Sequence, residues 1–139
     1  MSAMDLIKSM VVAASGLKAQ SGRMRVIAEN IANADSAARV PGGDPYRRKI
    51  VTFEEKLNRE IGAKTVAIGR PTFDKTEFKL KYMPGHPGAD ENGYVKYPNV
   101  NTLIETMDMR EAQRTYEANL NVVTVSRQML GRTLDILRG

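Results

Sequence analysis

The chain has 139 residues, a formal net charge of +5, no Cys and no Trp. The lack of Cys excludes disulfide bonds and thiolate metal sites, and an aromatic content of 6% argues against a large self-contained core. No apolar run is long enough to cross a membrane, and we expect no cleavable signal peptide. All six prolines lie between Pro41 and Pro98, which leaves both ends of the chain free to form helices.

The first predicted element is a long helix within residues 1–35. Ser2 and Asp5 have the spacing of a capping box, and Asn33 suits the left-handed conformation of a helix C-terminus. Residues at heptad spacing form an apolar side that we predict packs against neighbouring helices: Ile7, Met10, Leu17, Met24 and Ile31.

A second long helix is predicted within residues 101–139, opened by a capping box at Thr102 and Glu105. Two adjacent apolar stripes make a face wider than one partner helix can cover. Helices of about 30–37 residues would be roughly 45–55 Å long, more than the ~35–40 Å of a compact globule of this size. We therefore expect partners from other chains. The main stripe contains Met109, Ala112, Tyr116, Leu120, Val123, Leu130, Leu134 and Leu137, and the second contains Ala118, Val122, Val125, Met129 and Ile136. Within the main stripe, the residues that we predict to pack between subunits are Met109, Tyr116, Leu120, Val123, Leu130 and Leu134.

The middle, residues 36–100, combines turns with short β-strands. Alternating or β-branched patterns predict strands at residues 48–53, 64–68, 76–82 and 93–97, and residues 54–61 are predicted as a short helix ended by Gly62. The fold class is therefore mainly α: two long terminal helices pair as a coiled-coil-like core, with a small irregular or β middle segment.

Few residues suit catalysis or cofactor binding. The single His, His86, lies in a Pro- and Gly-rich loop, and residues 90–93 fit a turn better than a calcium loop. We expect no enzyme activity, cofactor or metal. The run Arg47, Arg48 and Lys49 leaves a second hypothesis open, in which the protein binds nucleic acid or an anionic membrane.

Three asparagines in the predicted helices each have two possible interpretations. Asn30 and Asn33 are either part of a fraying helix C-terminus or amide contacts between subunits, and Asn119 lies either on a solvated face or in a polar pair that fixes helix register.

Three motifs, in order along the chain, resemble signatures of the flagella rod protein family of bacterial flagellar rod and hook proteins. The first is ASGLKAQ at residues 14–20 with ENIANADS at 29–36. The second is PYRRK at residues 45–49 with GHPGADENGYVKYPNVN at 85–101, similar to the proximal rod proteins, although Gly88 stands where the family has Asp. The third runs from residue 105 to 129 and resembles the C-terminus of these axial proteins.

The resemblance implies a structural subunit of the proximal rod, a hollow shaft that transmits torque and lets exported subunits pass. It implies homo- and hetero-oligomers in a helical tube in the periplasm, export without signal cleavage, and contacts with other rod subunits, a rod adapter protein and the inner-membrane ring or export gate. It implies no nucleic acid partner. The implied polar contacts between subunits are Asn30, Asn33, Arg114 and Asn119, and the implied contacts of the middle segment are Tyr46, Arg47, Arg48, Lys49, Tyr94 and Asn99.

Overall fold

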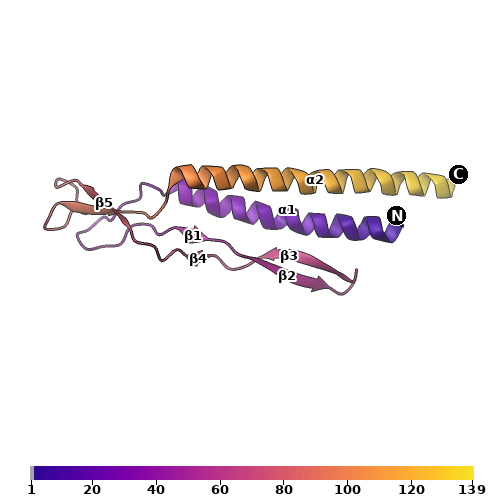
Figure 1. Ribbon diagram of the computed structural model, residues 1–139, viewed down its shortest axis with the longest axis horizontal. Helices are drawn as coiled ribbons and strands as arrows, with labels where there is room; N and C mark the ends of the chain where they lie inside the picture. Colours follow the sequence, from indigo (N-terminus) through magenta and orange to yellow (C-terminus); the bar gives the residue numbers. More distant parts are fainter. Residues whose placement is uncertain (1) are drawn as a thin grey trace. The chain divides into compact units, whose positions relative to one another are not determined.

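The structure is a computed structural model that describes residues 2–139, so Met1, the first residue of the predicted segment 1–35, lies outside the described residues. Long helices lie at the two ends, and the residues between them are rich in short strands, as predicted (Figure 1). The elements are α1 (Ala3–Ala32), β1 (Lys49–Ile50), β2 (Phe53–Asn58), β3 (Ala63–Ile68), β4 (Thr72–Phe73), β5 (Lys79–Tyr82), β6 (Tyr94–Tyr97) and α2 (Thr102–Arg138).

The predicted capping box of α1 is confirmed, and that of α2 is wrong. The N–H of Asp5 donates to Oγ of Ser2 at 3.2 Å, and the N–H of Ser2 donates to the Asp5 carboxylate at 3.3 Å. In α2, Oδ1 of Asn101 accepts the N–H of Leu103 at 3.1 Å, so Asn101 is the N-cap. Glu105 does not cap the helix because its carboxylate is bound by Arg48.

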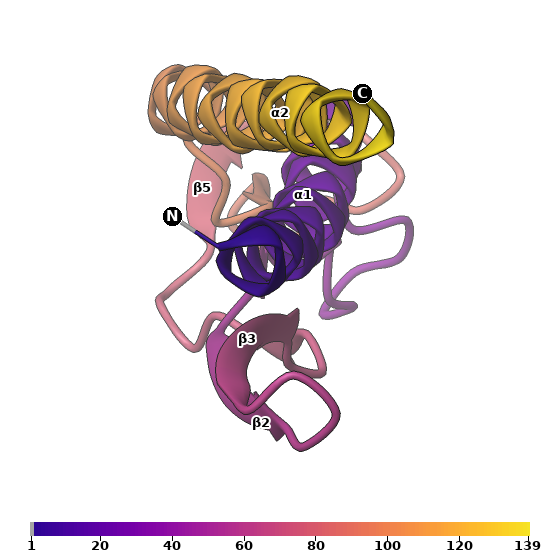
Figure 2. The same cartoon turned by 90° about the vertical axis from the view of Figure 1, so that its right-hand side faces the viewer.

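The six strands form three separate antiparallel pairs, each a two-stranded sheet. β1 pairs with β4, β2 with β3, and β5 with β6. Two-stranded sheets are marginal on their own and need other surfaces against which to pack. Figure 2 shows the β2–β3 hairpin beside α1, where the N–H of Val66 donates to Oγ of Ser15 at 3.2 Å.

Several predicted boundaries in the middle segment are wrong. Residues 54–61 are not a helix: they form most of β2 and the turn after it, which Gly62 closes with a positive φ of 64°. The predicted strand at 48–53 is divided between β1 and the first residue of β2, and the one at 76–82 is strand only from Lys79. Cross-strand pairing with β3 outweighs the helical propensity of the Glu- and Lys-rich run in β2.

Gly88, where the resemblance leads us to expect Asp, is sterically constrained in this structure. A Cβ atom at this position would lie 1.9 Å from the carbonyl oxygen of Ala38, a contact that no side chain can make. The loop between β5 and β6 therefore approaches the main chain of Ala38 more closely than any residue but glycine permits.

The chain divides into two compact units, and each helix contributes to both. The first unit comprises α1 up to Met24, residues 52–69 and residues 110–139. The second comprises residues 25–51 and 70–109. Buried side chains in the first unit include Leu6, Ala13, Ala19, Ala112 and Ser126, and those in the second include Val26, Ile27, Ala38, Val95 and Val100.

Candidate assembly surface

In the second unit, the side chain of Asn30 holds the main chain of Lys49. Its amide donates to the carbonyl oxygen of Lys49 at 2.9 Å, and its Oδ1 accepts the N–H of Lys49 at 3.0 Å. The hydroxyl of Tyr46 donates to the same Oδ1 at 2.7 Å. Only 1% of the surface of Asn30 is exposed, so its polar atoms are used inside the chain. Its contact with a neighbouring subunit stays a prediction.

The guanidinium group of Arg48 is bonded to acidic side chains. Its Nε donates to Glu105, its Nη1 donates to Asp74 at 3.2 Å, and its Nη2 lies 3.9 Å from the carboxylate of Asp108. Burial opposes the charge of Arg48, but hydrogen bonds and attraction to Glu105 and Asp74 outweigh burial and raise its pKa. Because Glu105 is only 1% exposed, Arg48 compensates a carboxylate that has almost no contact with solvent.

The other two basic side chains of the run are also held within the chain. The guanidinium of Arg47 lies 4.1 Å from the centre of the Phe78 ring and donates to the carbonyl oxygen of Asp74 at 2.8 Å. The ammonium of Lys49 lies 2.6 Å from a carboxylate oxygen of Glu29. Residues 47–49 are therefore not a free basic patch, which removes the observation on which the nucleic-acid and membrane hypothesis depended.

Asn99, three residues before α2, also forms a hydrogen bond with the main chain of residues 47–49. Its Oδ1 accepts the N–H of Arg48 at 2.8 Å, and its amide donates to the carbonyl oxygen of Asp74 at 3.0 Å and to Oγ1 of Thr76 at 3.0 Å. Asn30 and Asn99 thus bind main-chain groups of neighbouring residues, Lys49 and Arg48. We call residues 46–49 with Asn30, Asn99 and Glu105 the polar cluster.

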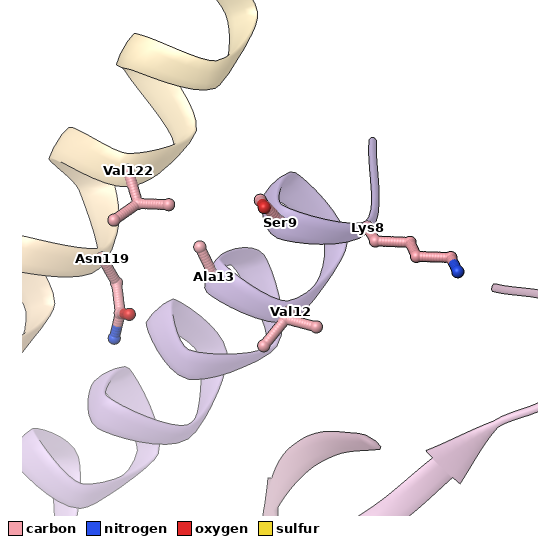
Figure 3. A pocket seen from close by; sticks show the side chains of 6 residues that line it. All are labelled: Lys8, Ser9, Val12, Ala13, Asn119 and Val122. Atoms are coloured by element: carbon pink, nitrogen blue, oxygen red, sulfur yellow. The ribbon is translucent and has the colours of Figure 1, made fainter. Parts of the chain in front are cut away.

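In the first unit, α1 and α2 meet along small side chains. A Cβ at Gly16 would lie 2.6 Å from Nδ2 of Asn119, so only glycine allows this approach without a shift. Ala112, Asn119 and Ser126 recur every seven residues and therefore lie on one line of α2. Figure 3 shows Asn119 and Val122 directed toward α1, with Ala13 facing them.

The two helices are antiparallel in this unit. Asn119 lies against Gly16, whereas Glu111, eight residues or about two turns earlier in α2, forms a 3.7 Å ion pair with Arg23, further along α1. Ala112 and Ser126 are buried on the contact line, whereas large apolar residues on either side of it remain exposed.

Two open, mostly apolar grooves, each of about 380 Å³, lie along this helix contact. The first is shown in Figure 3 and is lined by Lys8, Ser9, Val12, Ala13, Asn119 and Val122. The second is lined by Leu6, Ser9, Asn121, Val122, Val125, Ser126 and Met129.

The exposed apolar surface of α2 is greatest near its C-terminus. Ile136 is 79% exposed and Leu137 is 78% exposed. Within residues 110–139, exposed large apolar side chains lie on both sides of the contact line and, at Leu137, on its continuation: Leu120, Val122, Val125, Met129, Leu134, Ile136 and Leu137. Groups of exposed apolar side chains are common features of protein interaction sites. We call it the α2 apolar surface.

None of the residues predicted to pack between subunits is fully buried in the single chain. Ile7, Leu120 and Leu134 are exposed. The other eight are partly buried: Met10, Leu17, Met24, Ile31, Met109, Tyr116, Val123 and Leu130. Their contacts with neighbours stay predictions.

The remaining polar candidates occupy different environments. Asn33 is not in the left-handed conformation expected at the end of α1, because its φ is not positive. Instead its side-chain amide donates to the carbonyl oxygen of Glu29 at 2.9 Å, which satisfies a carbonyl of the last turn. Arg114 is exposed on α2. Tyr94 is exposed on β6, with its ring 5.4 Å from that of Tyr82. The structure thus brings the candidates Asn30, Tyr46–Lys49 and Asn99 into one cluster, and leaves Arg114 and Tyr94 outside it.

Sequence reasoning missed three features of these sites. The sequence pattern assigns Glu105 to a cap and gives no sign of Asp74. It places Ala112 in the main apolar stripe among larger residues, but it does not mark Ala112 and Ser126 as the contact between the helices. The seven-residue spacing of small side chains around Asn119 was a signal that could have identified the contact line. Nothing local in the sequence pairs Arg48 with Glu105, because the two residues are far apart along the chain.

Across residues 2–139, no helix has an apolar stretch long enough to cross a bilayer. Over the same residues, His, Asp and Glu side chains form no cluster of three or more that could hold a metal ion.

Comparison with known proteins gives two matching family models. One is described as "Flagella basal body rod protein" and matches residues 10–37, and the other, "Flagellar basal body rod FlgEFG protein C-terminal", matches residues 91–136. A "Flagellar basal-body rod protein FlgC" of Agrobacterium fabrum is 50% identical over 127 residues, covering 91% of each chain. Proteins of the same name from Borreliella burgdorferi and Salmonella typhimurium are each 39% identical; the alignments cover 98% and 96% of this chain and 100% and 98% of theirs.

Proposed function

The chain belongs to the FlgC family of flagellar basal-body rod proteins, a family of structural proteins and not of enzymes, and we propose that it builds the proximal rod by packing its terminal helices against those of neighbouring subunits. The observation that carries this proposal is the α2 apolar surface. These exposed apolar side chains lie along a helix of 37 residues. A neighbouring helix that covers them stabilises the assembly by about 25 cal/mol for each Å² of apolar area removed from water.

The helix contact supports a coiled-coil-like core. Ala112, Asn119 and Ser126 keep the seven-residue period of a coiled-coil seam, and Gly16 opposite them lets the helices approach closely. One helix covers this narrow line and leaves an apolar stripe on either side of it. Two uncovered stripes favour neighbours on two sides, which suits a helical, non-closing array of subunits.

The proposed assembly is a hollow tube that contains copies of this chain and other rod subunits. In it, residues 1–35 and 101–139 form the inner, helical wall, and residues 36–100 make contacts further out. Family resemblance suggests a rod adapter protein and the inner-membrane ring or export gate as further neighbours, a periplasmic location, and export without signal cleavage. Many interlocking helices resist twisting better than one flexible joint does, which suits transmission of torque.

The test replaces Leu120 by Asp in a strain whose own gene for this protein is deleted. Leu120 is exposed in the single chain, so the substitution spares the fold but places a charge in the proposed interface. We expect loss of swimming in soft agar and loss of the subunit from purified basal bodies. The control is Gln128→Asp on the polar side of the same helix, which we expect to swim normally. Normal swimming and incorporation of Leu120→Asp would contradict the interface.

A further inference from the structure

Strand β5 presents apolar side chains to solvent. All four of its residues are exposed, with Leu80 at 61% and Tyr82 at 66%. Lys79 and Lys81, which alternate with them, belong to the opposite face, where Lys81 pairs with the fully buried Val95. Leu80 and Tyr82 therefore share an exposed, largely apolar face with Tyr94 and Lys96, whereas Lys79 and Lys81, which are also exposed, share the other face with the buried Val95. We call the face of Leu80, Tyr82 and Tyr94 the apolar face.

The outer edge of β5 also carries free main-chain groups. On β6, the carbonyl oxygen of Lys96 accepts from the N–H of Ala38 at 3.0 Å, and that of Tyr94 accepts from the N–H of Asp90 at 2.9 Å. These two residues thus point away from β5, which makes Leu80↔Lys96 and Tyr82↔Tyr94 the non-hydrogen-bonded pairs of the ladder. The N–H and C=O groups of Leu80 and Tyr82 consequently face the outer edge, where β5 has no neighbouring strand among residues 2–139.

Lysines on an edge strand often protect it from other chains, but the lysines of β5 are engaged elsewhere. The ammonium of Lys79 donates to the carbonyl oxygen of Val100 at 2.7 Å. The ammonium of Lys81 lies 4.2 Å from the centre of the Tyr97 ring. Neither interaction covers the apolar face or the free edge.

The two tyrosines of this face form a corner. The rings of Tyr82 and Tyr94 have centroids 5.4 Å apart and planes inclined by 63°. An added Cβ at Gly93 would be 2.8 Å from the ring of Tyr82, so glycine at this position allows the ring to lie against the main chain. Both rings are exposed and offer apolar area to a side chain of a neighbouring strand.

We propose that the outer edge of β5 binds an extended segment of another protein, which adds a third strand to the hairpin and in which acidic and apolar side chains alternate. The main-chain groups of Leu80 and Tyr82 supply the pairing, and the corner made by Tyr82 and Tyr94 receives an apolar side chain. On the opposite face, acidic side chains of the added strand lie beside Lys79 and Lys81. Both lysines are exposed, and their partners within the chain, a carbonyl oxygen and an aromatic ring, leave their positive charges unneutralised. That the segment belongs to another basal-body protein rests on the proposed function, but the binding edge does not.

The test measures binding of a fluorescent peptide, in which glutamate and valine alternate, to the free full-length chain. We expect saturable binding that weakens as salt is raised. In an antiparallel arrangement, the valine N–H groups face β5 and the glutamate N–H groups face solvent. We therefore expect N-methylation of the valines to weaken binding by about tenfold or more, since several hydrogen bonds are lost, and N-methylation of the glutamates to have little effect; a parallel arrangement reverses this order.

A second arm changes the protein. Leu80→Pro removes the outward N–H without removing a hydrogen bond to β6, and Leu80→Ala is its control, with the N–H retained. We expect the Pro variant to bind about tenfold more weakly than the Ala variant. Absence of saturable binding, or equal binding of both methylated peptides and the unmethylated one, would overturn the proposal even if Leu80→Pro fails to fold. Self-association through β5 without peptide binding would also overturn it. Because these measurements use the free chain, they are independent of the swimming test.

Discussion

Asn30, Arg48 and Glu105 show at the scale of single residues how long-range polar contacts join distant parts of the second unit. Asn30 and Glu105 belong to helices at opposite ends of the chain, and both contact residues 48–49. Capping and turn patterns of single residues could be read from the sequence because their partners are a few positions away, as at Ser2 and Asp5. The contacts of the polar cluster could not be read from the sequence, because their partners are far apart along the chain and meet only when it folds.

Removal of Arg48 should be strongly destabilising. Arg48→Met leaves the buried carboxylate of Glu105 without its partner, and we expect a loss of about 3–5 kcal/mol in the free energy of unfolding in urea. The double variant Arg48→Met, Glu105→Leu should recover much of this loss, because it removes the unpaired charge. As a control, Lys64→Met in the exposed 3.5 Å pair with Glu55 should cost less than about 1 kcal/mol. Equal costs at both pairs would show that Glu105 is not effectively buried.

Tyr46 should titrate later than an ordinary tyrosine. Burial, followed by the negative charges of Glu29 and Glu105, raises its pKa to about 12. Since the folded-state pKa is raised, its contribution to stability is fully present below about pH 10, the unfolded value, and is lost as the pH rises toward 12. Ultraviolet absorbance of phenolate should therefore show one late step that Tyr46→Phe removes. Persistence of this step in the variant would assign it to another tyrosine.

At the scale of elements, the helices were more predictable than the strands. α1 and α2 follow from long proline-free runs with apolar periodicity, and α1 also from its capping box, so their extents agree closely with the prediction. β2 was predicted as helix because Glu, Lys and Leu have high helix propensity. Its strand conformation depends on pairing with β3 and on the packing of that hairpin against α1, where a Cβ at Gly22 would lie 2.8 Å from Cδ1 of Ile68.

Two helical glycines should respond differently to substitution by Ala. Nothing lies within 4 Å of a Cβ at Gly131, so Gly131→Ala should stabilise the free chain by roughly 1 kcal/mol through helix propensity. Gly16→Ala should gain less or lose stability, because Asn119 must move away from the new methyl group. Thermal unfolding of both variants under the same conditions measures the difference. An equal gain would mean that the contact between Gly16 and Asn119 is looser than the structure indicates.

At the scale of the whole molecule, the residues that fold the chain differ from those available for assembly. The helix contact uses small side chains such as Ala13, Gly16 and Ala112, while the large side chains of α2 remain exposed. The sequence predicts correctly that apolar surface is left uncovered, because two stripes exceed what one helix can bury. The sequence does not reveal which line of α2 lies against α1, because the predicted stripe groups Ala112 with larger residues that stay partly or fully exposed.

A double substitution at the C-terminal end of α2 should separate folding from assembly. Ile136→Asp, Leu137→Asp changes side chains that are mostly exposed, so we expect the free energy of unfolding of the free chain to change by less than about 0.5 kcal/mol. We expect the same variant to be missing from purified basal bodies. The matched control is Asp135→Asn, which leaves the apolar surface intact. A large loss of stability in the free chain would show that these residues fold against the chain itself.

The hydrogen bonds between Asn30 and the main chain of Lys49 affect which substitutions positions 30 and 49 can accept. Asn30 binds the N–H and C=O groups of position 49, which every residue except proline supplies. The side chain at position 49 can therefore change during evolution without loss of these two hydrogen bonds. The side chain of Asn30 supplies both the donor and the acceptor, and few other side chains place a donor and an acceptor at the same positions. Mutational tolerance should accordingly be broad at position 49, apart from proline, and narrow at position 30.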